Sequence, residues 1–243
     1  MTAPEPTILA TSGGIRPGGH TFFEFSALST FAVELAGITG RAPRVCFLAT
    51  ALGDNEAVLA RLHDAARLAG WQSSHVQLFP MPNVPDIREH LLAQDVVWVM
   101  GGSVAGLLAM WRVHRVHEAM RAAWEAGVVL TGVSAGSICW HIGGTTDSFG
   151  TDLRPVTNGL ALLPYSNGVH YDSEPQRRPL FQSLITDGAL PPGYATDDGV
   201  GLLYRGTELA EAVTEVDGKG AYWVERGSGC AAVEARLEVR RLT

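Results

Sequence analysis

Hydrophobic positions in the first half of the chain fall into two alternating kinds of segment. Short runs of consecutive apolar residues, such as "TILAT" (7–11) and "DVVWVM" (95–100), are typical of strands buried on both faces. Segments such as "NEAVLARLHDAARLAG" (55–70) repeat apolar residues every three or four positions, which indicates amphipathic helices. The alternation predicts an α/β fold with a mostly parallel sheet and helices on both faces. The predicted strands are 7–11, 44–50, 74–80, 95–100 and 128–133, and the predicted helices are 25–37, 55–70, 84–94 and 104–126.

The second half of the chain has a different pattern. Residues 143–175 are rich in loop-forming Gly, Thr, Asp, Pro and Asn, and 177–188 is predicted to be one helix. From residue 193 onward, short apolar segments separated by Gly-containing turns such as "VDGKG" (216–220) predict antiparallel strands. We expect these strands to extend the same sheet. Since no repeat and no linker divides the chain, residues 1–243 are predicted to form a single domain.

Composition narrows the class of protein. A chain of 243 residues with 46% hydrophobic and 18% charged residues fits an ordinary globular protein. Its net charge of −7 argues against nucleic acid and anionic membranes as partners. No apolar run is long enough to cross a bilayer, and the first residues do not have the pattern of a signal peptide. Cys46, Cys139 and Cys230 are odd in number and widely spaced, as expected for reduced, mostly buried thiols, so we predict a cytoplasmic location.

One serine lies where a predicted strand ends and a helix begins. In "LTGVSAGSICW" (130–140), Ser134 is flanked by Gly132 and Gly136, the G-x-S-x-G pattern of a nucleophile elbow. The strand 95–100 ends in a glycine pair at 101–102, and carboxyl ends of parallel strands meet at one sheet edge. Backbone amides of this turn and of Ala135 are therefore candidate donors for an oxyanion. A tight turn with no further role explains the glycine pair about equally well.

A nucleophilic serine needs a base, and histidine suits that role at neutral pH. Among the eight histidines, His170 is the best candidate because it lies in the polar segment "SNGVHYDSEPQRRP" that follows a short apolar stretch. The base in turn needs an acid to orient it. Asp197 and Asp198 in "ATDDGVGLL" and Asp147 in "GGTTDSFG" are all candidates. Adjacent strand residues face opposite ways, so only one of Asp197 and Asp198 can meet the histidine, but spacing alone does not choose among the three acids.

Five motifs, taken together in order and spacing, resemble the peptidase E (aspartyl dipeptidase) family of serine peptidases, which includes cyanophycinases. They are "MGGSVAGLLAMWR" (100–112), "GVSAGSICW" (132–140), "TTDS" (145–148), "LLPYSNGVHYDSEPQRR" (162–178) and "LPPGYATDDGVGLLY" (190–204). The resemblance covers most of the chain, from "TSGG" (11–14) to "GTELAEAV" (206–213). It implies a flavodoxin-like sandwich of the class I glutamine amidotransferase type, a Ser-His-acid triad, and neither a metal nor an organic cofactor.

The resemblance also assigns catalytic roles. Ser134 corresponds to the family's nucleophile and His170 to its base. Asp198 matches the third triad position, where the family often has a glutamate that is one methylene longer. Asp147 matches another acidic position near the family's site and is retained as a second acid. The oxyanion-hole donors correspond to the backbone amides of Gly102 and Ala135.

Substrate preference is the last expectation. Aspartyl dipeptidases cleave dipeptides with an N-terminal aspartate, and an arginine beyond the catalytic histidine receives that side chain. Arg177 and Arg178 follow His170 by seven and eight residues, and a guanidinium group fits a carboxylate, although a charged helix start on the surface is an equally good interpretation. We therefore expect a serine peptidase of dipeptides or short peptides, with an N-terminal Asp preference as the narrower hypothesis, acting as a monomer or homodimer. The alternatives are a cyanophycinase-like hydrolase of β-aspartyl links and a catalytically silent ligand-binding relative.

Overall fold

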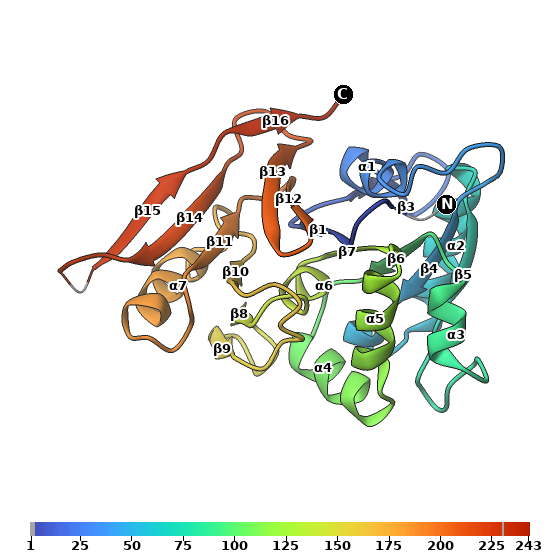
Figure 1. Ribbon diagram of the computed structural model, residues 1–243, viewed down its shortest axis with the longest axis horizontal. Helices are drawn as coiled ribbons and strands as arrows, with labels where there is room; N and C mark the ends of the chain where they lie inside the picture. The colour runs from blue at the N-terminus through green and yellow to red at the C-terminus, as the bar shows by residue number, and fades with distance from the viewer. Residues whose placement is uncertain (1–2, 230) are drawn as a thin grey trace.

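The computed structural model describes residues 3–229 and 231–243 and gathers their strands into two large sheets and one small hairpin (Figure 1). The helices are α1 (Ala27–Glu34), α2 (Glu56–Leu68), α3 (Ile87–Leu92), α4 (Val104–Val113), α5 (Val116–Glu125), α6 (Ala135–Ile138) and α7 (Arg177–Thr186), with a 3₁₀ turn η1 (Thr50–Leu52). The first strands are β1 (Thr7–Thr11), β2 (Ile15–Pro17), β3 (Phe23–Phe25), β4 (Arg44–Leu48), β5 (Gln72–His75), β6 (Val96–Val99), β7 (Val129–Val133) and β8 (Gly143–Thr146). The remaining strands are β9 (Arg154–Val156), β10 (Ser166–Gly168), β11 (Gly193–Thr196), β12 (Val200–Arg205), β13 (Glu208–Thr214), β14 (Ala221–Arg226), β15 (Ala232–Arg236) and β16 (Val239–Arg241).

The main sheet has the strand order β16-β13-β12-β1-β7-β6-β4-β5. From β1 to β5 every neighbouring pair is parallel, whereas β12 pairs antiparallel with β1 and β13 pairs antiparallel with β12. The predicted mostly parallel sheet, built from the continuous apolar runs of the first half, is therefore confirmed.

Helices cover both faces of this sheet, as the sequence predicts. On one face, Leu62 of α2 belongs to a buried cluster with Phe47 of β4 and Trp98 of β6. On the other face, Trp111 of α4 and the helices α5 and α6 pack in a second cluster with the alternate residues of the same strands, such as Leu48. Alternate residues of a strand point to opposite faces, so a strand that is apolar throughout supplies both clusters.

Two predicted elements differ from the structure by more than a few residues at their ends. The strand expected over 74–80 is β5, which ends at His75, because the chain then turns so that the backbone amides of Leu78 and Phe79 donate to the Asp54 carboxylate, at 2.5 and 3.1 Å. The helix expected over 104–126 is divided into α4 and α5, because Arg115 adopts a left-handed conformation with φ of 56°.

The expectation that all late strands extend the main sheet is wrong for several of them. β12, β13 and β16 do so, but β11, β14 and β15 join a second sheet of order β15-β14-β11-β10-β8-β9, which α7 covers (Figure 1). The divergence occurs at a tight turn, where Val200 N–H donates to the Asp197 carbonyl and Gly199 has a φ of 79°, so β11 and β12 enter different sheets. The ring contact of Tyr194 on β11 with Tyr204 on β12, with centroids 6.0 Å apart, joins the two sheets, and Tyr194 also contacts Trp223 of its own sheet at 4.8 Å.

The structure bears on two expectations from composition, the burial of the cysteines and the lack of a membrane-spanning segment. Cys46 and Cys139 are buried, and burial raises the pKa of the Cys46 thiol to about 12, whereas Cys230 lies outside the described residues. Within residues 3–229 and 231–243, no helix has the length and apolar character needed to cross a membrane.

Candidate active site

Ser134 occupies a sharp turn between β7 and α6. Its backbone has φ 57° and ψ −110°, a conformation that L-residues adopt at a cost of about 1–3 kcal/mol. The flanking glycines allow the turn to pack against the neighbouring strand: a Cβ on Gly136 would lie 2.3 Å from the Val99 carbonyl oxygen, and one on Gly132 would lie 2.6 Å from the same atom. The local sequence therefore produces the close-packed, strained geometry of a nucleophile elbow.

The Gly101–Gly102 turn faces this elbow, as the parallel sheet predicts. A Cβ on Gly101 would lie 3.2 Å from the Ser134 Cβ, so the two turns are in contact. Gly102 has a φ of 131°, and a Cβ there would lie 2.5 Å from the Ala51 carbonyl oxygen. Ala135 is the first residue of α6, directly after Ser134. Both candidate oxyanion donors therefore belong to the segments that border Ser134.

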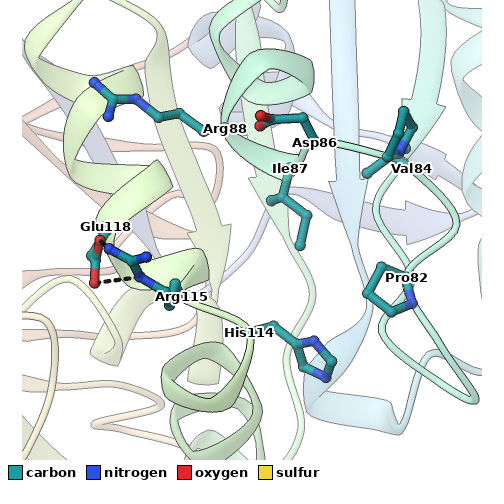
Figure 2. Close-up of a pocket in the computed structure, with 9 residues that line it drawn as sticks. Pro82, Val84, Asp86, Ile87, Arg88, His114, Arg115 and Glu118 are labelled. Carbon is teal, nitrogen blue, oxygen red and sulfur yellow. Dashed lines mark hydrogen bonds and ion pairs between the residues drawn. The ribbon is translucent and has the colours of Figure 1, made fainter.

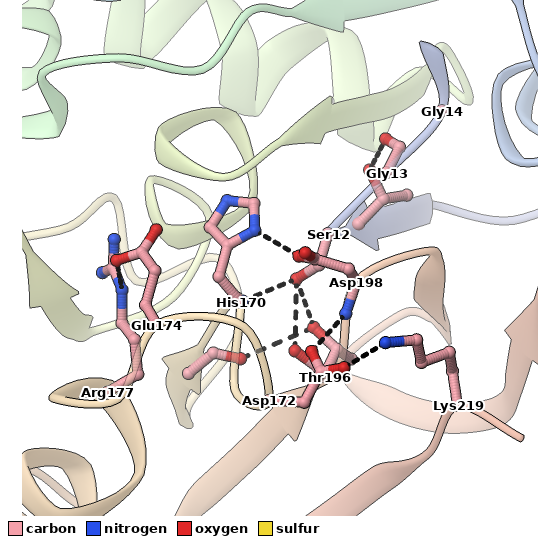
Figure 3. A network of polar contacts seen from close by, with 12 residues as sticks. Ser12, Gly13, Gly14, His170, Asp172, Glu174, Arg177, Thr196, Asp198 and Lys219 are labelled. Atoms are coloured by element: carbon pink, nitrogen blue, oxygen red, sulfur yellow. Dashed lines mark hydrogen bonds and ion pairs between the residues drawn. The ribbon is translucent and has the colours of Figure 1, made fainter. Parts of the chain in front are cut away.

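His170 and Asp198 form a short hydrogen bond, with 2.6 Å between Nδ1 and Oδ1 (Figure 3). His170 follows β10 and Asp198 follows β11, and because these strands are parallel their carboxyl ends meet at one edge. The bond to Nδ1 leaves Nε2, the other ring nitrogen, available for a proton from elsewhere. Their side chains are 21% and 42% exposed, so a substrate can approach the pair from solvent.

The end of β1 connects the serine and the histidine. The Ser134 N–H donates to the Thr11 carbonyl at 3.0 Å, and the His170 N–H donates to Ser12 Oγ at 3.3 Å. Ser12 Oγ also lies 2.7 Å from Thr196 Oγ1, next to the segment that carries Asp198 (Figure 3). Among the described residues, no hydrogen bond joins Ser134 Oγ to His170 Nε2, a bond that in many hydrolases tightens only when substrate binds.

The sequence analysis gives Ser12 no role, although "TSGG" marks the start of the region that the resemblance covers. Its only signal is its position directly after the central strand β1. The Ser12 hydroxyl reaches the His170 backbone only because the fold places the end of β10 near the end of β1. The sequence pattern does not predict that placement.

The three candidate acids occupy different places. Asp198 contacts His170, whereas Asp197 faces the other way and accepts hydrogen bonds from the Gly220 N–H and the Tyr222 hydroxyl, at 2.9 and 3.2 Å. Burial raises the pKa of Asp197. Asp147 is exposed on the loop after β8. Of the three, Asp198 is the one that the structure brings to the histidine.

Asp172 and Lys219 form a charged pair beside Asp198. The Asp198 N–H donates to Asp172 Oδ1 at 2.9 Å, and Asp172 forms an ion pair with Lys219 from the turn between β13 and β14 (Figure 3). Burial opposes ionisation of Asp172, but hydrogen bonds from Lys219 and from the Asp198 amide outweigh it, so the pKa of Asp172 lies below its ordinary value. Lys219 thus offsets negative charge where three aspartates gather.

Both candidate substrate arginines are engaged by the protein itself. Arg177 is only 2% exposed; its Nε donates to Glu174 Oε2 at 2.7 Å, and its Nη1 donates to the Thr145 carbonyl. Arg178 pairs with Glu234 and lies over the rings of Tyr171, in the turn after β10, and Tyr222 of β14, at 4.9 and 4.8 Å from their centroids.

An open hollow of about 580 Å³ adjoins the segment that follows His170. Its lining residues are Asp147, Gly150, Thr151, Leu153, Ser173, Glu174, Pro175 and Gln176. A different hollow, of about 400 Å³, lies between the loop before α3 and the α4–α5 junction (Figure 2), where Arg115 and Glu118 form an ion pair. Neither Ser134 nor His170 lines either hollow, but the first is lined by Ser173 and Glu174, which closely follow His170 in the chain, so it is the better candidate for substrate of the two.

Comparison with known proteins agrees with this geometry. Residues 9–212 match the model of peptidase family S51. The chain is 39% identical over 184 residues to the uncharacterized peptidase YgaJ of Bacillus subtilis strain 168, covering 75% of this chain and 78% of that protein. Two solved structures share the fold at 16% identity. They are a peptidase from an acI-B1 actinobacterium (TM-score 0.67, covering 97% of this chain and 95% of the other) and a Listeria monocytogenes EGD-e protein provisionally assigned to peptidase E (TM-score 0.60, covering 96% and 100%).

Proposed function

Because the chain belongs to peptidase family S51, a family of serine-type hydrolases, we propose that it cleaves dipeptides or other short peptides through an acyl-enzyme formed on Ser134. The observation that carries the proposal is the 2.6 Å hydrogen bond between His170 and Asp198 at the sheet edge where the Ser134 elbow lies. A strained serine, a histidine and an orienting carboxylate are the groups that acyl transfer requires.

In the proposed reaction, His170 Nε2 accepts the hydroxyl proton as Ser134 Oγ attacks the scissile carbonyl carbon. Asp198 holds the ring through Nδ1–H and stabilises the imidazolium that forms. The backbone amides of Gly102 and Ala135 donate to the developing oxyanion. The imidazolium then protonates the departing amine as the C–N bond breaks. Water, deprotonated by His170, attacks the ester and restores Ser134.

Ser12, Asp172 and Lys219 support this chemistry without touching the reacting atoms. Ser12 accepts the backbone N–H of His170, whose φ of 52° is unusual for a residue other than glycine. Asp172, neutralised by Lys219, accepts the backbone N–H of Asp198. These hydrogen bonds therefore fix the backbone of His170 and of Asp198, the two residues whose side chains take part in the proposed reaction.

An N-terminal Asp preference would depend on Arg177. Its buried guanidinium borders Glu174 and, through that residue, the hollow beside His170. A substrate carboxylate would compete with Glu174 for Nε, and Nη1 is already held by the Thr145 carbonyl. Arg178 would have to leave Glu234 and two aromatic rings, so Arg177 is the better candidate of the two.

The direct test is hydrolysis of a panel of dipeptides and aminoacyl anilides, some beginning with Asp and some neutral. The Ser134→Ala variant should lose at least about 10³-fold in kcat/KM. The matched control is Ser183→Ala, which removes an exposed hydroxyl on α7 and should retain wild-type activity.

The pattern of cleavage distinguishes the hypotheses. Cleavage of Asp-initial substrates alone would support the aspartyl dipeptidase hypothesis, and an Arg177→Met variant should then lose that preference. Cleavage of neutral substrates would still support the triad mechanism, but it would argue against a role of Arg177 in substrate preference. If nothing in the panel is cleaved but β-aspartyl-arginine peptides are, the activity is cyanophycinase-like. If neither class is cleaved, the peptidase proposal is wrong and the silent relative is favoured.

A further inference from the structure

Helix α2 and the edge strand β5 bring two histidine rings together away from the catalytic edge. His63 Nε2 lies 2.9 Å from His75 Nδ1, and the ring centroids are 5.1 Å apart. The other nitrogen of His63, Nδ1, lies 2.8 Å from Ser73 Oγ. All three side chains are half-buried, and their hydrogen bonds to one another hold the facing nitrogens in place.

A third histidine lies on the other face of β5, where His90 shares a hydrogen bond with Ser74 Oγ at 3.1 Å, so it is not part of the pair. The hydrogen bond between His63 and His75 requires a lone pair on one of the two facing nitrogens. Neutral imidazole offers a lone pair to a metal ion, whereas imidazolium does not.

The nitrogen spacing selects a coordination geometry. Imidazole nitrogens bind divalent metals at about 2.0–2.1 Å, so two of them 2.9 Å apart subtend an angle of about 90° at the metal. That is the angle between adjacent ligands in square-planar and octahedral complexes, typical of Cu²⁺ and Ni²⁺. Tetrahedral Zn²⁺ would require the two nitrogens to separate to about 3.3 Å.

We propose that His63 and His75 form a two-histidine chelating site for Cu²⁺ or Ni²⁺, with water in the remaining positions. The His63 Nδ1–H donates to Ser73 Oγ, which directs the Nε2 lone pair toward the metal. The metal takes the place of the hydrogen bond between the two nitrogens: His75 binds through Nδ1, and the proton that Nδ1 shares with His63 moves to Nε2. Within the described residues, no group of three or more His, Cys, Asp or Glu side chains is arranged to hold a metal, so binding is weaker than at a full protein cage.

The site is separate from the proposed hydrolysis. In the main sheet, β6 and β4 lie between β7, which carries Ser134, and β5. With neighbouring strands about 4.8 Å apart, the metal lies roughly 14 Å from the strand that leads to the nucleophile. Its effect is to attach the edge strand to α2, and it stabilises the folded chain because it binds the folded form only.

The test is titration of the purified, untagged chain with CuCl₂ or NiCl₂ in a non-chelating buffer, followed by calorimetry and thermal melting. One ion should bind per chain, Cu²⁺ more tightly than Ni²⁺ and Ni²⁺ more tightly than Zn²⁺, and the melting temperature should rise. His63→Gln and His75→Gln should each weaken binding at least tenfold and abolish the rise. Ser73→Ala should still bind the metal, with a smaller loss of affinity than either histidine variant.

The control is the double variant His114→Gln/His117→Gln, which removes two histidines at the α4–α5 junction and should bind metal as the wild type does. Electron paramagnetic resonance of Cu²⁺ on the wild-type chain should show coupling to histidine nitrogens, a result that does not depend on any variant folding. The absence of one-to-one binding, unchanged affinity in both single variants, or a Cu²⁺ spectrum without nitrogen coupling would each overturn the proposal.

Discussion

At the scale of single residues, Asp198 and Asp197 show how neighbouring side chains of one type acquire different chemistry. Asp198 hydrogen-bonds to His170, while Asp197 is turned toward Gly220 and Tyr222. Strand alternation predicts that only one of the pair can meet the histidine. It does not say which, because the answer depends on where β10 lies relative to β11.

Replacing Asp198 should impair catalysis much more than replacing its neighbour. In Asp198→Asn the ring of His170 loses its orienting anion, so kcat should fall about 10²–10⁴-fold with little change in melting temperature. The measurement is steady-state peptide hydrolysis beside Asp197→Asn, which preserves shape and an acceptor for the Gly220 amide. Equal losses in the two variants would show that Asp198 is not the orienting acid.

At the scale of secondary-structure elements, the β7–α6 turn determines where Ser134 lies. The turn approaches β6 so closely that Gly136 has no room for a side chain. A Gly136→Ala variant should lose about 1–3 kcal/mol of unfolding free energy and most of its activity, because the elbow must move. Gly19→Ala is the control, since no atom lies within 4 Å of its added methyl. Urea denaturation of both variants checks the prediction, and a Gly136→Ala chain as stable as the wild type would contradict it.

The elements also show how much of the fold can be predicted from the sequence alone. Four of the five parallel strands carry apolar runs and are predicted from them, whereas β5, "QSSH", is polar and shares only two residues with its predicted range. The contact between the two glycine-containing turns follows from that sheet. The second sheet was missed because β10 and β11 are short and polar, "SNG" and "GYAT", and their pairing depends on partners far along the chain. Ser12 was missed for the same reason, since its contacts with His170 and Thr196 cross 158 and 184 residues.

At the scale of the whole molecule, one buried histidine connects the elbow helix to the place where the two sheets meet. His141 is fully buried; its Nδ1 lies 2.9 Å from the Ser137 carbonyl and its Nε2 lies 3.2 Å from the Tyr204 hydroxyl. Burial, opposed by the bond to Ser137, lowers its pKa from 6.5 to about 4. In the folded chain this ring therefore stays neutral over a range in which the unfolded chain binds a proton.

Stability should fall as the pH decreases from 6.5 toward 4, because only the unfolded state gains the His141 proton in that window. Over the full window the loss approaches roughly 3 kcal/mol. Denaturant unfolding of the wild type and of His141→Gln at several pH values measures it, and the variant should show a shallower dependence. His114→Gln serves as a control on another histidine. Parallel pH curves for wild type and His141→Gln would contradict the assignment.

The most direct test of the central claim, that Ser134 and His170 act as one catalytic unit, is a double-mutant comparison. The kcat/KM for a cleaved peptide is measured for Ser134→Ala, His170→Ala and the variant carrying both. Residues that serve a single nucleophilic step lose nearly everything when either is removed, so each single variant should fall at least about 10³-fold and the double variant should be no worse than the single ones. Losses that multiply in the double variant, or a Ser134→Ala chain that retains substantial activity, would contradict the serine mechanism.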